Sequence, residues 1–180
     1  GSGEDGDADG VGDAAEFCGP RGLALSPDGG VLFVADDENH KIRRVEVTTG
    51  AVTTLAGSGE DGDADGVGDA AEFCQPLRSR PQLRRECTAA HVALPSARMA
   101  ACCLWQTMRT TRSGGLMFVA DFVNHKIRRV EVTTGAVTTL AGSGEDGDAD
   151  GVGDAAEFDG PSGAALSSNG SALFVADFVN

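Results

Sequence analysis

The strongest constraint on the fold is an internal repeat. The stretch GSGEDGDADGVGDAAEF begins at Gly1 and recurs unchanged from Gly57 and from Gly142. Residues 39–73 and 124–158 are identical at every position, so the longer second interval must come from extra sequence after Pro76. Repetition at a spacing of tens of residues indicates stacked structural units, each too small to bury a core alone.

Each unit is predicted to contain four short strands. In the first unit, runs rich in apolar and β-branched residues at 22–26, 31–35, 41–47 and 51–55 are separated by turn residues. The Asp-Gly pair at 28–29 is a strong hairpin signal, because it lies between two apolar runs. The run at 31–35 is apolar on both faces, as expected for a strand buried between neighbouring sheets. Four antiparallel strands and a long polar joint are typical of a β-propeller blade.

Several motifs resemble those of a known family. They are DGVGDAAEF at 9–17, PRGLA at 20–24, LFVAD at 32–36 and NHKIR at 39–43. In this order, and repeated, they resemble the NHL-repeat family of propellers over residues 1–75 and 115–180. The resemblance implies an all-β fold, an incomplete β-propeller built from four-stranded antiparallel blades. Propellers close with roughly four to eight blades, so about two and a half blades predict a fragment of a longer propeller.

The expected organisation has three parts. Residues 1–56 form a blade with its acidic inter-blade joint, residues 57–141 a second blade, and residues 142–180 a joint with the first half of a third blade. The second blade is interrupted at 76–113 by a basic segment that has no counterpart in the repeats. This segment is either a genuine insertion that docks on an acidic surface or the product of a retained intron or a gene-model error.

The charge of the chain restricts its partners. It has 28 Asp and Glu residues against 14 Lys and Arg, a formal net charge of −14, and the repeats carry the excess acid. An acidic surface repels nucleic-acid phosphates and anionic lipids and attracts cations and basic proteins. No apolar run reaches the roughly 18 residues needed to cross a bilayer. We therefore expect a protein or a small cationic ligand as partner, with no nucleic acid and no membrane, while localisation stays open.

The acidic joint is also a candidate calcium loop. From Asp5 to Glu16 it follows D-x-D-x-D-G-x5-E, the spacing of an EF-hand loop, although neither flank is predicted to be helical. Two alternatives stay open: a structural joint alone, in which Phe17 fills the gap between sheets, or a joint that also binds calcium weakly. Calcium is the only cofactor that these residues suggest. The candidate metal ligands in the three copies are Asp5, Asp7, Asp9, Glu16, Asp61, Asp63, Asp65, Glu72, Asp146, Asp148, Asp150 and Glu157.

A second polar group invites a catalytic interpretation. Asp36, Asn39 and His40 lie together after an apolar strand, and the same group recurs in the second unit. Its recurrence favours a role in ordering the loop, because Asp and Asn side chains bond local backbone groups. The basic residues at 41–44 are expected to form surface ion pairs, each worth little.

These observations predict a non-catalytic NHL-type propeller segment, a scaffold that binds a protein or another ligand through its acidic loop face. The alternative is a fragment of a propeller enzyme, a metal-dependent lyase or lactonase, because some propellers of similar sequence carry a metal in the central channel. Its catalytic residues would then lie in blades missing from this chain. A His or Glu present in one blade only would favour the enzyme.

Overall fold

The computed structural model describes residues 1–74, 109–110 and 115–178. The basic segment predicted at 76–113 therefore lies outside the described residues, apart from a two-residue strand. Within this part of the chain the structure consists of β-strands, short 3-10 turns and loops, and no helix there is long and apolar enough to cross a membrane.

The strands form two five-stranded antiparallel sheets and one two-stranded sheet. Blade 1 contains β1 (Gly10–Val11), β2 (Pro20–Leu25), β3 (Val31–Asp36), β4 (Lys41–Glu46) and β5 (Ala51–Ala56), in the spatial order β1-β5-β4-β3-β2. Blade 2 contains β6 (Gly66–Val67), β7 (Arg109–Thr110), β8 (Leu116–Asp121), β9 (Lys126–Glu131) and β10 (Ala136–Ala141), in the order β6-β10-β9-β8-β7. The half-blade contains β11 (Pro161–Leu166) and β12 (Leu173–Asp177). The predicted all-β fold of propeller-type antiparallel blades is confirmed.

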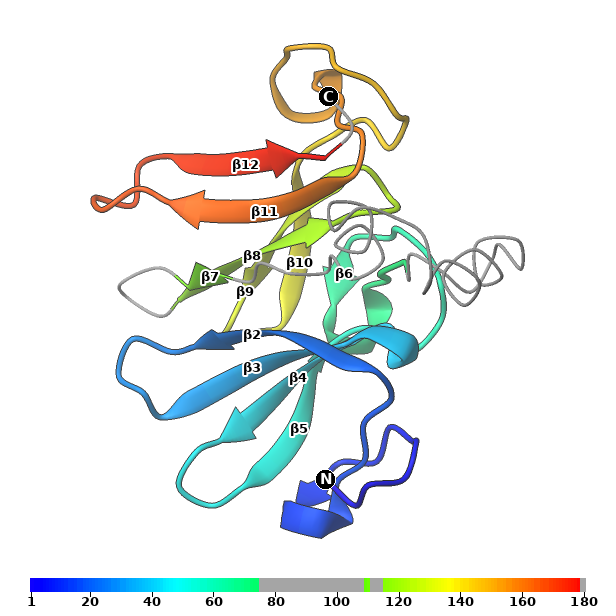
Figure 1. Cartoon of the computed structure of the whole chain (residues 1–180), viewed down its shortest axis with the longest axis vertical. Helices are drawn as coiled ribbons and strands as arrows, with labels where there is room; N and C mark the ends of the chain where they lie inside the picture. Colours follow the sequence, from blue (N-terminus) through cyan, green and yellow to red (C-terminus); the bar gives the residue numbers. More distant parts are fainter. Residues whose placement is uncertain (75–108, 111–114, 179–180) are drawn as a thin grey trace, which may run out of the picture.

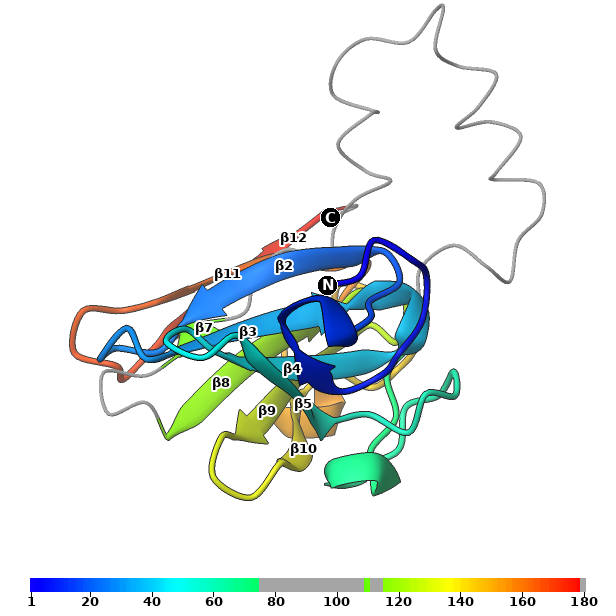
Figure 2. The ribbon, with the colours of Figure 1, turned by 90° about the horizontal axis from the view of Figure 1, so that it is seen from below.

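The sheets lie one above another along the longest axis, from the N-terminal blade to the half-blade (Figure 1). Seen from below, the strands of blade 1 lie across those of blade 2 (Figure 2). A hydrophobic core fills the space between these two blades, and Phe33, Ile42 and Met117 are fully buried in it. Phe73 is also fully buried in this core, so the phenylalanine of the second acidic segment fills the gap between sheets. Phe17, for which this role was predicted, is only half-buried.

Three copies of the acidic segment connect and flank the blades. We call residues 1–17 joint 1, residues 57–73 joint 2 and residues 142–158 joint 3. Each contains a 3-10 turn, namely η1 (Gly12–Ala14), η3 (Gly68–Ala70) and η6 (Gly153–Ala155).

Joints 1 and 2 each add a fifth strand to the blade that follows them. In joint 1, Gly10 pairs with Val52 and Val11 with Ala51 on β5, and β6 pairs with β10 in the same way. This fifth strand was not predicted, because two residues are too few to show the alternation by which strands are recognised in sequence.

The turn between β3 and β4 lies on the same side of the molecule as the joints. It is the 3-10 turn η2 (Asp37–Asn39), and the hairpin turns of the blades lie on the opposite side (Figure 1). The pairing of β3 with β4 runs without a break from Val31 opposite Glu46 to Asp36 opposite Lys41. This register carries the basic residues of β4 to the place where joint 1 crosses the blade.

Candidate functional site

The candidate site in blade 1 is centred on the guanidinium group of Arg43, which is fully buried. Its Nη1 donates to Asp36 Oδ2 at 2.7 Å and to the Glu16 carbonyl at 3.0 Å. Its Nη2 donates to Asp9 Oδ1 at 2.8 Å and to the Ala8 carbonyl at 3.0 Å. The prediction of a surface ion pair is therefore wrong for Arg43, because joint 1 folds over β4 and covers this side chain.

The ring of Phe17 completes the surroundings of this cation. The guanidinium carbon of Arg43 lies 5.1 Å from the ring centroid, within the range of a cation–π contact. A buried charge is tolerated only when it is paired and hydrogen-bonded, and here two carboxylates, two carbonyls and an aromatic ring share that task.

Asp36 and Asn39 order the loop that follows β3. Asp36 is fully buried, and its Oδ1 accepts from the backbone N–H of Cys18 at 2.8 Å. Its Oδ2 accepts from Asn39 Nδ2 at 2.8 Å, and the same amide nitrogen donates to the Gly6 carbonyl at 2.8 Å. These contacts join blade 1 to joint 1 and occupy both carboxylate oxygens.

Two of the predicted calcium ligands in joint 1 are committed to side chains of the blade. Asp7 pairs with the ammonium group of Lys41, which lowers the pKa of this carboxyl. Asp9 pairs with Arg43 and also accepts from the backbone N–H and the hydroxyl of Thr54, each at 3.2 Å. Both carboxylates therefore hold joint 1 against β4 and β5.

The other two predicted ligands of joint 1 point elsewhere. Asp5 is exposed. The carboxylate of Glu16 lies over Gly6, so closely that a Cβ at this glycine would come within 2.1 Å of Glu16 Oε2. Among the residues that the structure describes, no three His, Cys, Asp or Glu side chains are grouped so as to hold a metal ion. Calcium binding by the joints stays a prediction.

Blade 2 repeats this arrangement. Arg128 is fully buried and donates to Asp121 at 3.0 Å and to Asp65 at 2.9 Å, and Lys126 Nζ lies 2.5 Å from Asp63 Oδ2. The guanidinium of Arg128 lies over the ring of Phe73 in joint 2. The carboxylate of Glu72 lies over Gly62, as Glu16 lies over Gly6 in joint 1. The recurrence supports a structural role for the whole set.

Asp121 is a fully buried carboxyl with a raised pKa. Its burial raises its pKa to about 6, although Asn124 and Arg128 both donate to it. The pKa of Asp63 shifts in the opposite direction. The hydrogen bond from Lys126 lowers the pKa of this carboxyl, because it outweighs the slight desolvation of the group.

Joint 3 has the same sequence without these partners. Asp148 and Asp150, the counterparts of the two paired aspartates, are exposed and form no ion pair within the described part of the chain. Asp146 is exposed as well, and Glu157 lies over Gly147 as in the other joints. The half-blade supplies two strands, and the strand that carries lysine and arginine in blades 1 and 2 is not among the described elements.

The predicted histidine has a role that sequence reasoning missed. His40 has a left-handed backbone, with φ of 53°, and its Nδ1 lies 3.1 Å from the Phe73 carbonyl and 3.9 Å from Asp61 Oδ1. In the same way His125 Nδ1 lies 3.0 Å from the Phe158 carbonyl. Each histidine thus ties its blade to the next joint, a contact over 33 residues that only the repetition of both partners could have indicated.

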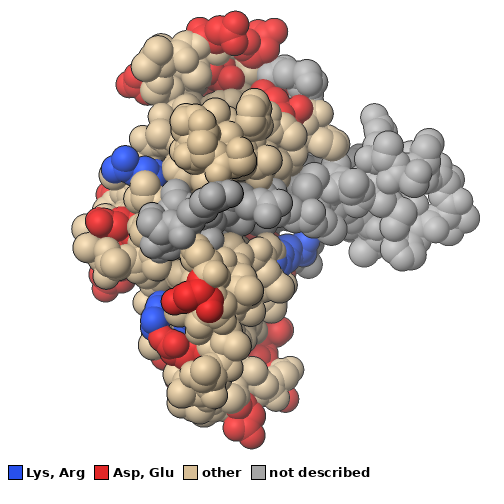
Figure 3. All heavy atoms as spheres, turned by 90° about the vertical axis from the view of Figure 1, so that its left-hand side faces the viewer, with Lys and Arg blue, Asp and Glu red and all other residues tan. Residues whose placement is uncertain are grey.

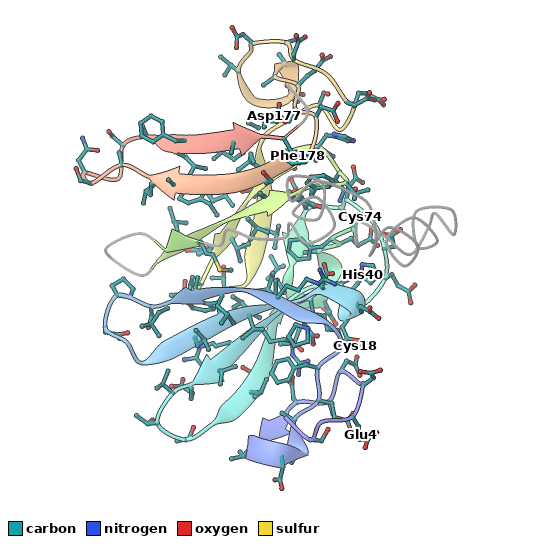
Figure 4. The ribbon with its side chains drawn as sticks, in the orientation of Figure 1. Glu4, Cys18, His40, Cys74, Asp177 and Phe178 are labelled. Carbon is teal, nitrogen blue, oxygen red and sulfur yellow. The ribbon has the colours of Figure 1, made fainter. Side chains whose placement is uncertain are left out.

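Two cysteines lie beside these contacts. In Figure 4, Cys18, His40 and Cys74 lie along one side of the molecule. Cys18 Sγ donates to Glu38 Oε2 at 3.4 Å. Burial, assisted by the neighbouring Asp61, raises the pKa of the Cys74 thiol and keeps it protonated. A protonated thiol is a poor nucleophile.

Comparison with known proteins agrees with this architecture. The NHL-repeat family model matches residues 17–44. NHL repeat-containing protein 2 of Bos taurus is 34% identical over 176 residues, covering 92% of this chain and 20% of that protein. The chloroplastic protein SUPPRESSOR OF QUENCHING 1 of Arabidopsis thaliana is 30% identical over 172 residues, covering 91% of this chain and 13% of that protein. The chain thus spans a fifth or less of the length of these curated relatives.

Solved structures share the fold at lower identity. An auxiliary nutrient binding protein from Bacteroides ovatus superposes with a TM-score of 0.61 at 20% identity, covering 87% of this chain and 34% of that chain. A protein of the same description from Bacteroides thetaiotaomicron gives a TM-score of 0.59 at 22% identity, with the same coverage. At these identities the likeness concerns the fold alone.

Proposed function

The chain is built from NHL repeats of a β-propeller, and on that premise we propose that it is a non-catalytic binding scaffold whose acidic joints recognise a basic segment of a partner protein. The observation that carries this proposal is the division of the joint carboxylates into two groups. One group is committed to internal contacts, as Asp7 and Asp9 are. The other group is exposed, forms no ion pair with a described lysine or arginine, and recurs in each joint.

The exposed group lies in the joints, on the side of the molecule opposite the hairpin turns (Figure 1). Figure 3 views the molecule from the hairpin side, and acidic side chains are visible there at its upper end. Because surface ion pairs contribute only about 0–1 kcal/mol each, recognition of a basic segment requires several carboxylates together. The exposed residues, by joint, are Glu4, Asp5 and Asp13; Glu60, Asp61 and Asp69; Glu145, Asp146 and Asp154.

The buried residues of the blades, Arg43 and Asp36 with their counterparts in blade 2, support the non-catalytic part of the proposal. A general acid or base must come within hydrogen-bond reach of its substrate. Arg43 and Asp36 are fully buried and bonded to each other and to joint 1, and the same holds for their counterparts in blade 2. Their contacts explain these residues as parts of the scaffold.

A binding titration tests the proposal. A fluorescent lysine- and arginine-rich peptide is titrated with the 180-residue chain, and anisotropy is measured at several salt concentrations. We expect saturable binding that weakens as salt rises, because exposed charges are screened over about 10 Å at 0.1 M salt. A glutamate-rich peptide of equal length should not bind.

Matched variants separate the joints from net charge. The triple variant Asp13→Asn, Asp69→Asn, Asp154→Asn removes one exposed carboxylate from each joint, and we expect it to bind the basic peptide about tenfold more weakly. The control removes three acids away from the joints, through Asp28→Asn, Glu46→Gln and Glu131→Gln. Equal weakening in both triple variants would show that the joints have no special role, and absence of binding at low salt would refute the proposal.

A further inference from the structure

We propose that joint 1 carries a socket for the histidine turn of a further NHL blade. The histidine turn is the segment Asn39–Lys41 in blade 1 and its copy at 124–126 in blade 2. The socket is a cavity of about 360 Å³ lined by Gly1, Gly3, Glu4, Asp5, Phe17, Gly19 and Pro20, and Figure 4 labels Glu4 beside it. This inference does not rest on the proposed function.

The corresponding positions of joint 2 are filled by the histidine turn of blade 1. A Cβ at Gly59 would lie 3.4 Å from Lys41 Cε and 3.9 Å from the Asn39 carbonyl oxygen. His40 makes the other two contacts in joint 2, with the Phe73 carbonyl and with the Asp61 carboxylate. These three positions correspond to Gly3, Phe17 and Asp5 of the socket.

Joint 3 is filled in the same way by the histidine turn of blade 2. A Cβ at Gly144 would lie 3.2 Å from Lys126 Cε, and His125 Nδ1 lies 3.0 Å from the carbonyl of the joint phenylalanine. The same ring nitrogen lies 3.4 Å from the backbone nitrogen of Gly160, which corresponds to Gly19 of the socket. Both joints thus show the same occupant at two shared positions, the glycine and the carbonyl of the phenylalanine.

Burial of the joint phenylalanine depends on the blades on both of its sides. Phe73, which lies between the two five-stranded blades, is fully buried. Phe17 and Phe158 are only half-buried: Phe17 lines the cavity, and Phe158 is followed by two described strands. A blade packed on joint 1 would cover the Phe17 ring, and burial of apolar surface favours association. The face is therefore shaped for a protein occupant.

Charge and backbone shape identify that occupant. The socket presents two carboxylates, Glu4 and Asp5, and the histidine turn presents a lysine and a histidine. Both described histidines have a left-handed backbone, with φ of 53° and 52°, which directs the ring toward the next joint. Both described turns already occupy joints 2 and 3, so the occupant of joint 1 is an Asn-His-Lys turn from outside the described residues.

A synthetic turn provides the test. The probe is a capped peptide with the sequence of residues 119–131, VADFVNHKIRRVE, titrated into the isotope-labelled 180-residue chain while amide chemical shifts are recorded. We expect the shifts to change in residues 1–20 and joints 2 and 3 to stay unchanged. A peptide in which the histidine is replaced by alanine should bind about tenfold more weakly, because it loses the hydrogen bond that both described histidines make.

Variants of the chain complete the test. Asp5→Asn should weaken binding of the peptide, whereas Asp146→Asn, the same change in a joint that His125 already fills, should not. The inference is overturned if the histidine and alanine peptides bind equally, if no shifts change at millimolar peptide, or if the shifts map to the edge of β12. Since the peptide resembles a blade strand, that last result would indicate strand addition in place of turn recognition.

Discussion

Joints 1 and 3 have identical sequences and different surroundings. Their backbones share local features: the glycine that begins each 3-10 turn has φ of 61° or 62°, and one backbone hydrogen bond of 2.8 Å, from Ser2 to Ala15 or from Ser143 to Ala156, closes each loop. Their carboxylates do not behave alike. Both Asp9 and its counterpart Asp150 are exposed, but Asp9 pairs with a buried arginine, whereas Asp150 forms no ion pair within the described part of the chain.

The backbone shape of a joint and the ion pairs of its carboxylates therefore have different causes. Glycines in the left-handed region and short-range backbone bonds fix the shape of the joint, and neither requires the blade. The ion pairs require β4, the residues of which lie more than 30 positions away in the chain. Whether a joint carboxylate is paired or unpaired is therefore decided by the blade that follows it.

The largest expected effect comes from removing the buried guanidinium of Arg43. Arg43→Met leaves the buried carboxylate of Asp36 without its charge partner, and breaking a buried pair in this way costs about 3–5 kcal/mol in the free energy of unfolding. Urea denaturation measures the loss. Arg44→Met, next to it but partly exposed, is the control and should change the free energy by about 1 kcal/mol or less. Equal losses would mean that burial of Arg43 has no energetic consequence.

A second test compares the same substitution in two joints. Asp9→Asn weakens the charged bonds to Arg43 and Thr54 and should lower the free energy of unfolding by about 1–3 kcal/mol. Asp150→Asn, at the matching exposed position, should change it by about 0.5 kcal/mol or less. The measurement is again urea denaturation, and a cost for Asp150→Asn as large as that for Asp9→Asn would contradict the comparison.

A smaller effect follows from the raised pKa of Asp121. With a pKa of about 6 in the folded state and about 4 in the unfolded state, the native protein holds a proton that the unfolded chain has released. The contribution of this group to stability therefore falls as pH rises from about 4 to about 6. Denaturation midpoints across this range should decline less in Asp121→Asn. An unchanged slope would exclude Asp121 as its source.

The pKa of Asp63 is lowered where that of Asp121 is raised, so the pH dependence of its contribution to stability has the opposite sign, and Asp63 is the matched control. Lys126 lowers its pKa, so its contribution is present above the ordinary value of 3.8 and is lost as pH falls below it. Asp63→Asn should therefore leave the decline between about 4 and 6 in place.

Calcium gives the smallest expected signal and sharpens the comparison further. Asp7 and Asp9 would have to leave Lys41 and Arg43 to bind the ion, whereas Asp148 and Asp150 would not. We expect calorimetric heat in the affinity class of about 10⁻⁴ to 10⁻³ M, lost in the double variant Asp148→Asn, Asp150→Asn. It should persist in Asp7→Asn. Heat that survives the double variant would contradict this assignment, and absence of heat at millimolar calcium would refute the calcium prediction.

Much of the fold was predictable because the signals are local. The strands expected at 31–35 and 51–55 are observed at Val31–Asp36 and Ala51–Ala56, since apolar runs between turn residues suffice to place them. The fifth strand was missed because its two residues, Gly10 and Val11, show no alternation. The repeat predicted that Phe17 fills a gap between sheets; its copy Phe73 does so, whereas Phe17 itself is only half-buried.

The candidate site was only partly predictable. The sequence indicated that Asp36 and Asn39 order a loop, because such residues bond nearby backbone groups. It did not indicate that Arg43 is buried, since an arginine beside many carboxylates on a strand is ordinarily at the surface. Nor did it indicate that His40 contacts the following joint, because that contact requires two blades to be packed together.

By itself, the sequence determined the repeating unit, its strands and the local shape of the acidic joints, because these depend on apolar periodicity, turn residues and glycines that act within a few positions. Tertiary structure alone decided which carboxylates pair with basic side chains of a blade, and which joint carbonyls contact a histidine of the preceding blade. Those properties depend on side chains brought together from different strands and blades, and identical stretches of sequence acquire different chemistry when their neighbours differ.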